Sequence, residues 1–181
     1  MPAPACRVVR LDAPERHPEL IAQVEAIFWQ TAARTYLPGS ERDAFRERWL
    51  GRYLQGDTDV VLLALAGEDT VAGYLVGTVE DPAPQPRFAD IGYFRTDFVE
   101  LTKRFPAHLH INLDAAFRGQ GIGAQLIEAF AGHARRAAAP GMHAVTGKAM
   151  RNVGFYIRCG FTERATAPWN GREIVFLARE F

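Results

Sequence analysis

The sequence has little cysteine, no excess of charge and no long apolar run. Its two cysteines, Cys6 and Cys159, have neither metal-ligand nor thioredoxin-like spacing, so we expect a reducing cytosol and no metal site. Basic and acidic residues number 21 each, which favours neither a nucleic-acid partner nor a membrane surface. Residues 1–10 lack the apolar core of a secretory signal, and no segment is long enough to span a bilayer. A cytoplasmic protein is expected.

Length and composition fit one globular domain over residues 1–181. With 48% hydrophobic and 23% charged residues, the chain can bury one sizeable core and has no room for a second large domain. The sequence is compatible with either a monomer or a homodimer.

Hydrophobic periodicity predicts an alternation of strands and helices. The expected strands are 6–11, 60–66, 70–79, 108–113, 142–148, 161–166 and 173–178. The expected helices are 18–35, 40–53, a long one from 122 toward Pro140, and a short one that begins at Asn152. Ser40 with Asp43 is expected to open the second helix. Residues 81–107 are too rich in aromatic side chains for a flexible linker and predict an ordered insertion on the substrate side.

The most informative segment is the glycine-rich turn at 118–124. It follows a strand of alternating residues and opens an apolar-periodic helix. Its glycines let a ligand approach the backbone where the first helical N–H groups are unpaired and the helix dipole is positive, so the turn predicts a pyrophosphate site. Ala124 and Gln125 lie where a P-loop has a Lys-Ser or Lys-Thr pair, which disfavours a nucleotide triphosphatase. The G-x-G-x-G spacing also differs from the G-x-G-x-x-G frame of a dinucleotide-binding turn.

The pattern R-x-x-G-x-G, from Arg118 to Gly123, resembles the acyl-coenzyme A pyrophosphate loop of the GCN5-related N-acetyltransferases, the GNAT superfamily. A second motif, from Asn152 to Phe161, is similar to the family's N-x-x-x-Y helix and the G-F turn that follows it. The resemblance implies an α/β (α+β) fold. Its mixed, mostly antiparallel central sheet is flanked by helices, and its central strands splay apart.

The resemblance also implies acetyl-CoA as cosubstrate and assigns its ligands by position. The pyrophosphate residues are Arg118, Gly119, Gln120, Gly121, Ile122, Gly123 and Ala124, and the strand groups for the pantetheine arm belong to Ile111, Asn112 and Leu113. Asn152 is implied to hold the same arm, and Tyr156 to lie near the sulfur as a proton donor. A purely structural alternative makes Asn152 an N-cap and Gly160 a C-cap.

Attack by an amine on a thioester requires a neutral amine, so a base is expected. His108 and His110 share one side of the core strand with Asn112, and either is a candidate base or a packing residue. The weaker acidic candidates are Asp97, Glu100 and Asp114, whereas a structural role is expected for His133 and His143. One aromatic group is expected either to line an acceptor pocket or to pack in the core. Its members are Trp29, Tyr36 and Trp49.

The phrase P-A-H-L-H-I at 106–111, after the aromatic insertion, narrows the resemblance. It is similar to the branch that holds the C-terminal acetyltransferase-like domain of eukaryotic O-GlcNAcase and its free-standing bacterial relatives. That eukaryotic domain is regarded as a pseudo-acetyltransferase, whereas this chain keeps Arg118 and the glycines. The predicted function is an acetyl-CoA-dependent N-acetyltransferase acting on an unidentified small-molecule or peptide amine by direct attack. The alternatives are a non-catalytic acetyl-CoA-binding module and a purely structural domain.

Overall fold

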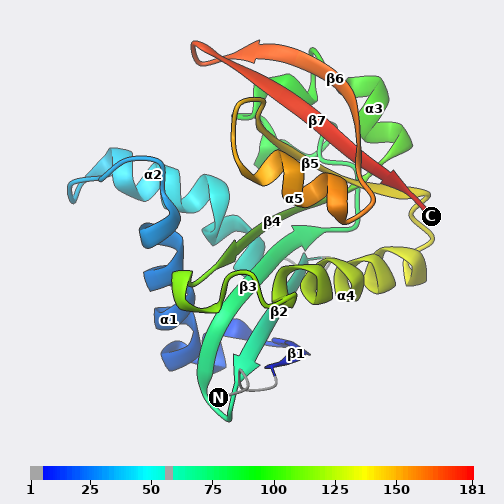
Figure 1. Cartoon of the computed structure of the whole chain (residues 1–181). Helices are drawn as coiled ribbons and strands as arrows, with labels where there is room; N and C mark the ends of the chain where they lie inside the picture. Colours follow the sequence, from blue (N-terminus) through cyan, green and yellow to red (C-terminus); the bar gives the residue numbers. More distant parts are fainter. Residues whose placement is uncertain (1–5, 56–58) are drawn as a thin grey trace. The chain divides into compact units, whose positions relative to one another are not determined.

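The computed structural model describes residues 6–55 and 59–181 (Figure 1). These residues form a seven-stranded sheet in the order β1-β2-β3-β4-β5-β7-β6. The strands are β1 Cys6–Arg10, β2 Asp59–Ala66, β3 Thr70–Thr78, β4 Ala107–Leu113, β5 Gly141–Gly147, β6 Thr162–Trp169 and β7 Arg172–Glu180. The α-helices are α1 Pro18–Thr31, α2 Ser40–Trp49, α3 Val99–Arg104, α4 Ile122–Arg136 and α5 Asn152–Arg158. The predicted element order is confirmed, with α3 added inside the insertion.

Short 3-10 helices complete the chain. They are η1 Pro14–Arg16, η2 Gly51–Leu54, η3 Pro86–Phe88, η4 Gly92–Phe94 and η5 Ala115–Phe117. Strands β4 and β5 pair in parallel, with Ala107 opposite Met142 and His108 opposite His143. Antiparallel registers join β1 to β2, β5 to β7 and β6 to β7. The sheet is therefore mixed and mostly antiparallel, as predicted.

Two helix boundaries differ from the sequence prediction. Helix α1 ends at Thr31 rather than Thr35, because the backbone becomes extended at Ala32 with ψ of 138°. Helix α2 ends at Trp49, and the residues up to Leu54 continue as the tighter turn η2. Helix α2 begins at Ser40, as predicted, and Gly39 is its N-cap with φ of 140°. A glycine gives the chain this entry conformation at little steric cost.

The chain divides into two compact units. Unit 1 comprises the residues up to Gly77 together with His110–Phe130, and unit 2 comprises Thr78–Leu109 together with Ala131–Phe181. Strand β4 and helix α4 each contribute residues to both units. The single domain expected from the sequence stays a prediction.

Unit 1 is built around β2, whose eight residues are all buried. A strand covered on both faces reads as a continuous hydrophobic run, and the sequence VVLLALA has that character. The turn to β3 contains Gly67, whose φ of 70° suits a glycine. The first part of α4 adds an apolar stripe to this core through Ile122, Leu126, Ile127 and Phe130.

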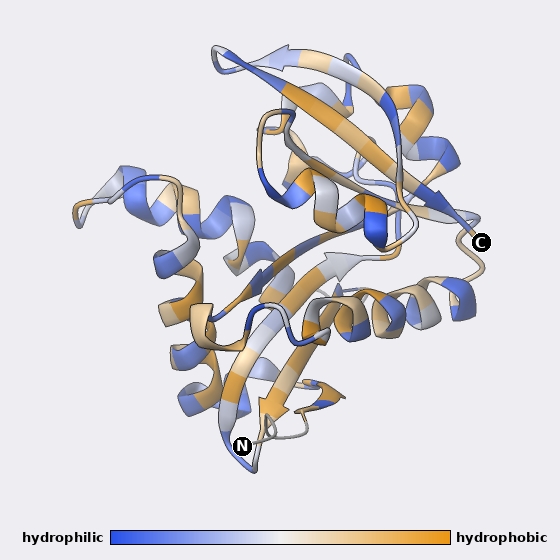
Figure 2. Cartoon of the chain, viewed as in Figure 1, coloured by the Kyte–Doolittle hydropathy of each residue, from blue (hydrophilic) through white to orange (hydrophobic). Residues whose placement is uncertain are grey.

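Unit 2 contains the aromatic insertion, which folds as η3, η4 and α3. Five of its aromatic side chains are at most 3% exposed: Phe88, Tyr93, Phe94, Phe98 and Phe105. Strand β7 is buried through its middle and exposed at its ends. Figure 2 shows the matching hydropathy, with hydrophobic residues in the middle of the strand and hydrophilic residues at its ends. The insertion is thus part of a core rather than a surface loop.

Candidate active site

The glycine turn between β4 and α4 has the backbone geometry of an anion site. Gly119 and Gly121 have φ of 76° and 79°, a left-handed conformation that favours glycine. Among the described residues, no atom lies within 4 Å of a Cβ placed at either position. The first bond of α4 runs from the Gln125 N–H to the Gly121 carbonyl at 3.2 Å, so the helical N–H groups before Gln125 have no helical acceptor. This arrangement fits a pyrophosphate.

The side chains of the turn contact nearby backbone. Arg118 donates from Nε and Nη2 to the Leu113 carbonyl at 3.3 and 3.2 Å, and Gln120 donates from Nε2 to the Ala116 carbonyl at 3.1 Å. Both side chains belong to exposed residues, so these contacts are easily exchanged for a ligand. A pantetheine group that binds the Leu113 carbonyl must compete with Arg118.

His110 lies on β4 between two aromatic side chains of unit 1. Its Nε2 is 3.0 Å from the Tyr53 hydroxyl, and its ring centroid is 5.2 Å from that of Trp49 and 5.3 Å from that of Tyr53. Burial, and then the Arg52 guanidinium, lower the pKa of His110 to about 4. The imidazole is therefore neutral at physiological pH.

Asn112 occupies the next position on the same side of β4. Its Nδ2 donates to the Tyr74 hydroxyl at 2.8 Å. Tyr74 is fully buried, and burial raises the pKa of its phenol despite the opposing effect of the Asn112 hydrogen bond. The side chain of Asn112 is thereby fixed, and the residues implied to offer backbone groups, Ile111 to Leu113, are half-buried.

His108 lies inside the aromatic cluster of unit 2. It is 2% exposed, and its ring centroid lies 5.0 Å from Phe88, 5.4 Å from Phe94 and 5.5 Å from His143. His143 is fully buried, stacks on Phe176 at 4.4 Å and bonds the Phe105 carbonyl through Nδ1. The surroundings of both histidines are those of packing residues.

Tyr156 lies on α5 and is 4% exposed, with ring contacts to Phe155 at 5.3 Å and Phe161 at 5.4 Å. Burial, and to a smaller extent Cys159, raise the pKa of its phenol. The group is therefore fully protonated at neutral pH, as a hydrogen donor must be. The C-cap of the helix is Cys159 rather than the predicted Gly160, which follows it with φ of 84°, a left-handed conformation common just after a helix end.

Asn152 is exposed at the start of α5. Its Oδ1 accepts a hydrogen bond from the Thr146 hydroxyl at 3.0 Å, and Arg151 is the N-cap residue. The capping alternative for Asn152 is therefore wrong, because its side chain points to β5. Its implied role at the pantetheine arm stays a prediction.

The acidic candidates are engaged in local contacts. Asp97 accepts from the Thr96 hydroxyl at 2.6 Å, and Glu100 pairs with Lys103 at 2.7 Å. Asp114 accepts from the Ala116 N–H at 2.8 Å and caps η5. Each contact explains the acid without a role in proton transfer.

Two of the three aromatic residues proposed for an acceptor pocket form a cluster with Phe45. Its centroid lies 4.4 Å from Tyr36 and 6.2 Å from Trp29. A hollow of about 360 Å³ lies beside them, lined by residues 35–41, in which Leu37 is 82% exposed. Trp49 packs on His110 instead.

Sequence reasoning missed the two tyrosines that fix the polar side chains of β4. Tyr53 and Tyr74 are fully buried, and their hydroxyls contact His110 and Asn112. The usable signal was the presence of polar residues on a core strand, because such groups require hydrogen-bonding partners. The identity of the partners depends on tertiary packing.

The architecture is that of an acyltransferase fold. A family model described as an acetyltransferase (GNAT) domain matches residues 60–163, and the chain belongs to this family. The sequence has no significant match among curated proteins.

Several solved structures are similar to the chain. SsHAT has a TM-score of 0.69 at 21% identity and covers 99% of this chain and 98% of its own. A protein of Salmonella typhimurium named yncA, solved with its cofactor acetyl-CoA, has a TM-score of 0.60 at 18% identity, with 97% and 94% covered. A Bacillus anthracis protein named as a streptothricin acetyltransferase, in complex with acetyl coenzyme A, has a TM-score of 0.54 at 16% identity, with 72% and 68% covered. At these identities the likeness shows the fold.

Within residues 6–55 and 59–181, no group of three or more His, Cys, Asp or Glu side chains is arranged to hold a metal ion. In that same described part of the chain, no helix has the length and apolar character needed to cross a membrane.

Proposed function

We propose that the protein transfers the acetyl group of acetyl-CoA to a primary amine by direct attack. The observation that carries this proposal is the glycine turn, with two left-handed glycines, open space above them and a helix N-terminus behind them. Family membership supports the same cosubstrate. Residues 118–124 would bind the pyrophosphate, and Ile111 to Leu113 and Asn152 the pantetheine arm.

His110 is the better of the two histidine candidates for the base. A base must reach the acceptor amine, and His108 is 2% exposed among aromatic rings. His110 is half-buried and neutral at physiological pH, so its imidazole can accept a proton. Its low pKa also means that the proton is not retained.

Tyr156 would stabilise the departing thiolate. Its raised pKa lies above the roughly 8.5 of an ordinary thiol, so complete transfer of the phenolic proton to sulfur is uphill. A hydrogen bond from the hydroxyl to the sulfur, strengthening as negative charge develops, is the favoured form of assistance. The thiolate can then be protonated by solvent or by the proton taken from the amine.

We further infer that the chain belongs to the branch related to the C-terminal domain of O-GlcNAcase. The supporting feature is the phrase at 106–111 after an aromatic insertion. The insertion is buried in unit 2, and the phrase begins β4 and carries both histidines. The acceptor class is left to experiment.

The test is an acetylation screen with the full chain and acetyl-CoA. The panel contains spermidine, kanamycin, streptothricin, phosphinothricin, an alanine-terminated peptide and a lysine peptide. Thiol release and mass spectrometry of the products are measured together, and acetyl-CoA binding is measured by calorimetry. We expect at least one acetylated amine. Binding without any acetylated product would instead favour the non-catalytic binding module.

A further inference from the structure

Two polar side chains of β4 each meet a buried tyrosine hydroxyl, and the two contacts differ in chemistry. His110 Nε2 lies 3.0 Å from the Tyr53 hydroxyl, and Asn112 Nδ2 donates to the Tyr74 hydroxyl at 2.8 Å. An amide keeps its donors and its charge at every pH, whereas an imidazole changes both when it takes a proton. Of these two contacts, that of His110 is therefore the one that responds to proton transfer.

On the proposed function, His110 takes up a proton in each turnover. The amine nitrogen bonds to the acetyl carbon and gives one proton to the imidazole, while the C–S bond breaks and leaves its electron pair on sulfur. The imidazole becomes neutral again when its proton reaches that sulfur or solvent. In the interval the ring is an imidazolium, in which both nitrogens are hydrogen-bond donors. Its Nε2–H then points at the Tyr53 hydroxyl, which is the group next to Nε2.

Three side chains of unit 1 face the imidazole, namely Tyr53 and Arg52 from η2 and Trp49 from α2. A guanidinium and an indole have donors only, so the Tyr53 oxygen is the hydrogen-bond acceptor among the three. The Arg52 charge disfavours a second positive charge beside it. Among these neighbours, Tyr53 is thus the one whose hydrogen bond favours the charged ring.

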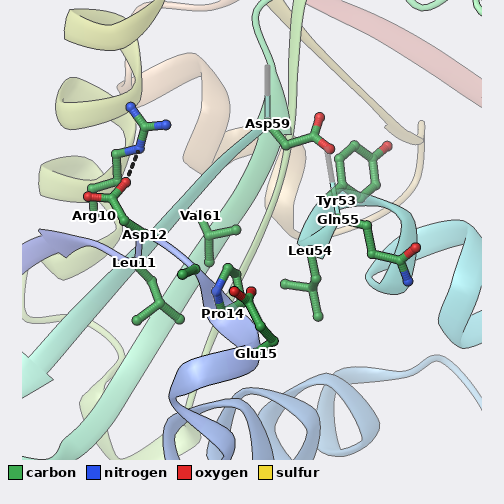
Figure 3. A pocket seen from close by; sticks show the side chains of 11 residues that line it. Arg10, Leu11, Asp12, Pro14, Glu15, Tyr53, Leu54, Gln55, Asp59 and Val61 are labelled. Carbon is green, nitrogen blue, oxygen red and sulfur yellow. Dashed lines mark ion pairs between the residues drawn. The ribbon is translucent and has the colours of Figure 1, made fainter. Parts of the chain in front are cut away.

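The position of the Tyr53 oxygen is fixed by the packing of its ring. Tyr53 is 0% exposed on η2, and its side chain forms part of the wall of a cavity of about 430 Å³ (Figure 3). An acceptor that is already in place requires little reorganisation when charge develops on its partner. Phenylalanine would keep this wall, because the oxygen is the one heavy atom that it lacks.

We propose that Tyr53 is a positioning residue for the acetyl transfer, because its hydroxyl orients the His110 ring and accepts the Nε2–H bond when that ring becomes charged. A hydroxyl can donate as well as accept, so it bonds Nε2 in either protonation state of the ring. The Tyr74 hydroxyl has no such role, since its Asn112 partner does not change charge. The proposal rests on the proposed function and adds to it the residue that orients the base.

The deciding variant is Tyr53→Phe, measured with the panel amine that the parent acetylates fastest. We expect kcat to fall about tenfold, a part of the roughly 10²-fold or more that a positioned base contributes. The KM for the amine and the Kd for acetyl-CoA should stay within about twofold of the parent values, because the bond to Tyr53 strengthens only as the ring becomes charged. In nitrogen-15 NMR, Tyr53→Phe should shift the Nε2 resonance of His110 more than the Nδ1 resonance.

A double-mutant cycle tests whether Tyr53 acts through His110. His110→Gln should lower kcat by roughly 10²-fold, and Tyr53→Phe should cause no further loss in that background, because residues that act as a unit are not additive. Tyr74→Phe is the matched control, since it also removes a buried hydroxyl that contacts β4. Its effect on kcat, whatever the size, should be the same with and without His110→Gln.

A second replacement covers the case in which Tyr53→Phe does not fold. Replacing Tyr53 by 3-fluorotyrosine keeps the hydroxyl and nearly the same shape, but fluorine withdraws electrons and makes the oxygen a weaker acceptor. We expect a fall in kcat of about twofold, with the KM for the amine unchanged.

The outcomes separate the two proposals. A parent that binds acetyl-CoA but acetylates no panel amine overturns the proposed function and the positioning role with it. A parent that turns over, with Tyr53→Phe of equal kcat, overturns the positioning role alone. The same holds if Tyr53→Phe slows the reaction equally with and without His110→Gln, or raises KM at constant kcat. If Tyr53→Phe does not fold, a fluorotyrosine protein of parental kcat overturns the positioning role, and a slowed one supports it.

Discussion

At the scale of single residues, the polar groups of β4 differ from one another through their surroundings. His108 and His110 are two positions apart on one strand, yet one packs among phenylalanines and the other contacts a tyrosine hydroxyl. Sequence patterning placed them on the same side of the strand and left their roles open. The contacts that separate them come from residues distant in the sequence, which periodicity does not report.

His110 should make the protein less stable in acid. Its pKa is about 4 in the folded protein against an ordinary 6.5, so the unfolded chain binds the proton more readily. The stability from the neutral imidazole is complete above about pH 6.5 and is lost as the pH falls toward 4. Denaturant unfolding measures the free energy of unfolding at both pH values. Between pH 7 and pH 4.5, this free energy should fall by roughly 2 kcal/mol more in the parent than in His110→Asn. Equal losses would mean that the folded pKa is ordinary.

Tyr156→Phe should lower kcat by roughly 10²-fold and leave acetyl-CoA affinity nearly unchanged. The phenol is fully protonated because burial raises its pKa, and its loss removes the hydrogen donor for the sulfur. Phenylalanine keeps the contacts with Phe155 and Phe161, so stability should be little affected. Steady-state kinetics and calorimetry check both parts, and a fully active variant would leave sulfur protonation to solvent.

At the scale of elements, the order of strands and helices was predictable because each has a clear hydrophobic period. Strands are predicted at 60–66 and 70–79, and the structure has β2 and β3 there. The ends of the helices were less predictable. Helix α1 ends at Thr31 through a conformational change at Ala32, and α2 ends at Trp49, where the chain continues as η2. Neither end has a strong residue signal.

The part of the candidate site that depends on backbone conformation was predictable from the sequence. The glycines of the turn indicate its conformation, because left-handed backbone angles favour glycine. The short helix α3 inside the insertion was not predicted, because six residues give too little periodicity. The tyrosine partners of β4 come from η2 and β3, and only tertiary packing brings them to the strand.

The glycine turn supplies a prediction that belongs to the element as a whole. Gly121→Ala places a methyl group in the open space above the turn and strains its backbone, so it should weaken acetyl-CoA and free CoA binding equally, because both share the pyrophosphate. Gly67→Ala is the matched control, since Gly67 also has a left-handed φ and open surroundings but lies in the β2–β3 turn. Calorimetry should show a loss only for Gly121→Ala. If Gly121→Ala weakened the binding of acetyl-CoA but not of free CoA, the methyl group would act near the acetyl group rather than at the pyrophosphate.

At the scale of the whole molecule, the question is whether the two units unfold together. Strand β4 passes from unit 2 into unit 1 after Leu109, and α4 passes from unit 1 into unit 2 after Phe130. Unfolding of one unit would therefore break a strand and a helix in the middle, where hydrogen bonds are cooperative. This continuity favours one cooperative transition.

The three tryptophans allow that transition to be followed in each unit. Trp29 and Trp49 lie in unit 1, and Trp169 lies in unit 2. The variant Trp169→Phe keeps only the tryptophans of unit 1 and reports on that unit. The double variant Trp29→Phe/Trp49→Phe keeps only Trp169 and reports on unit 2. We expect the fluorescence midpoints in urea to agree with each other and with circular dichroism. Acetyl-CoA at about 100 times its Kd should raise the stability seen by both probes by about 2.7 kcal/mol, since a ligand of the native state stabilises everything that unfolds with its site. Separate midpoints, or a shift confined to one probe, would contradict the single domain and show that the units fold independently.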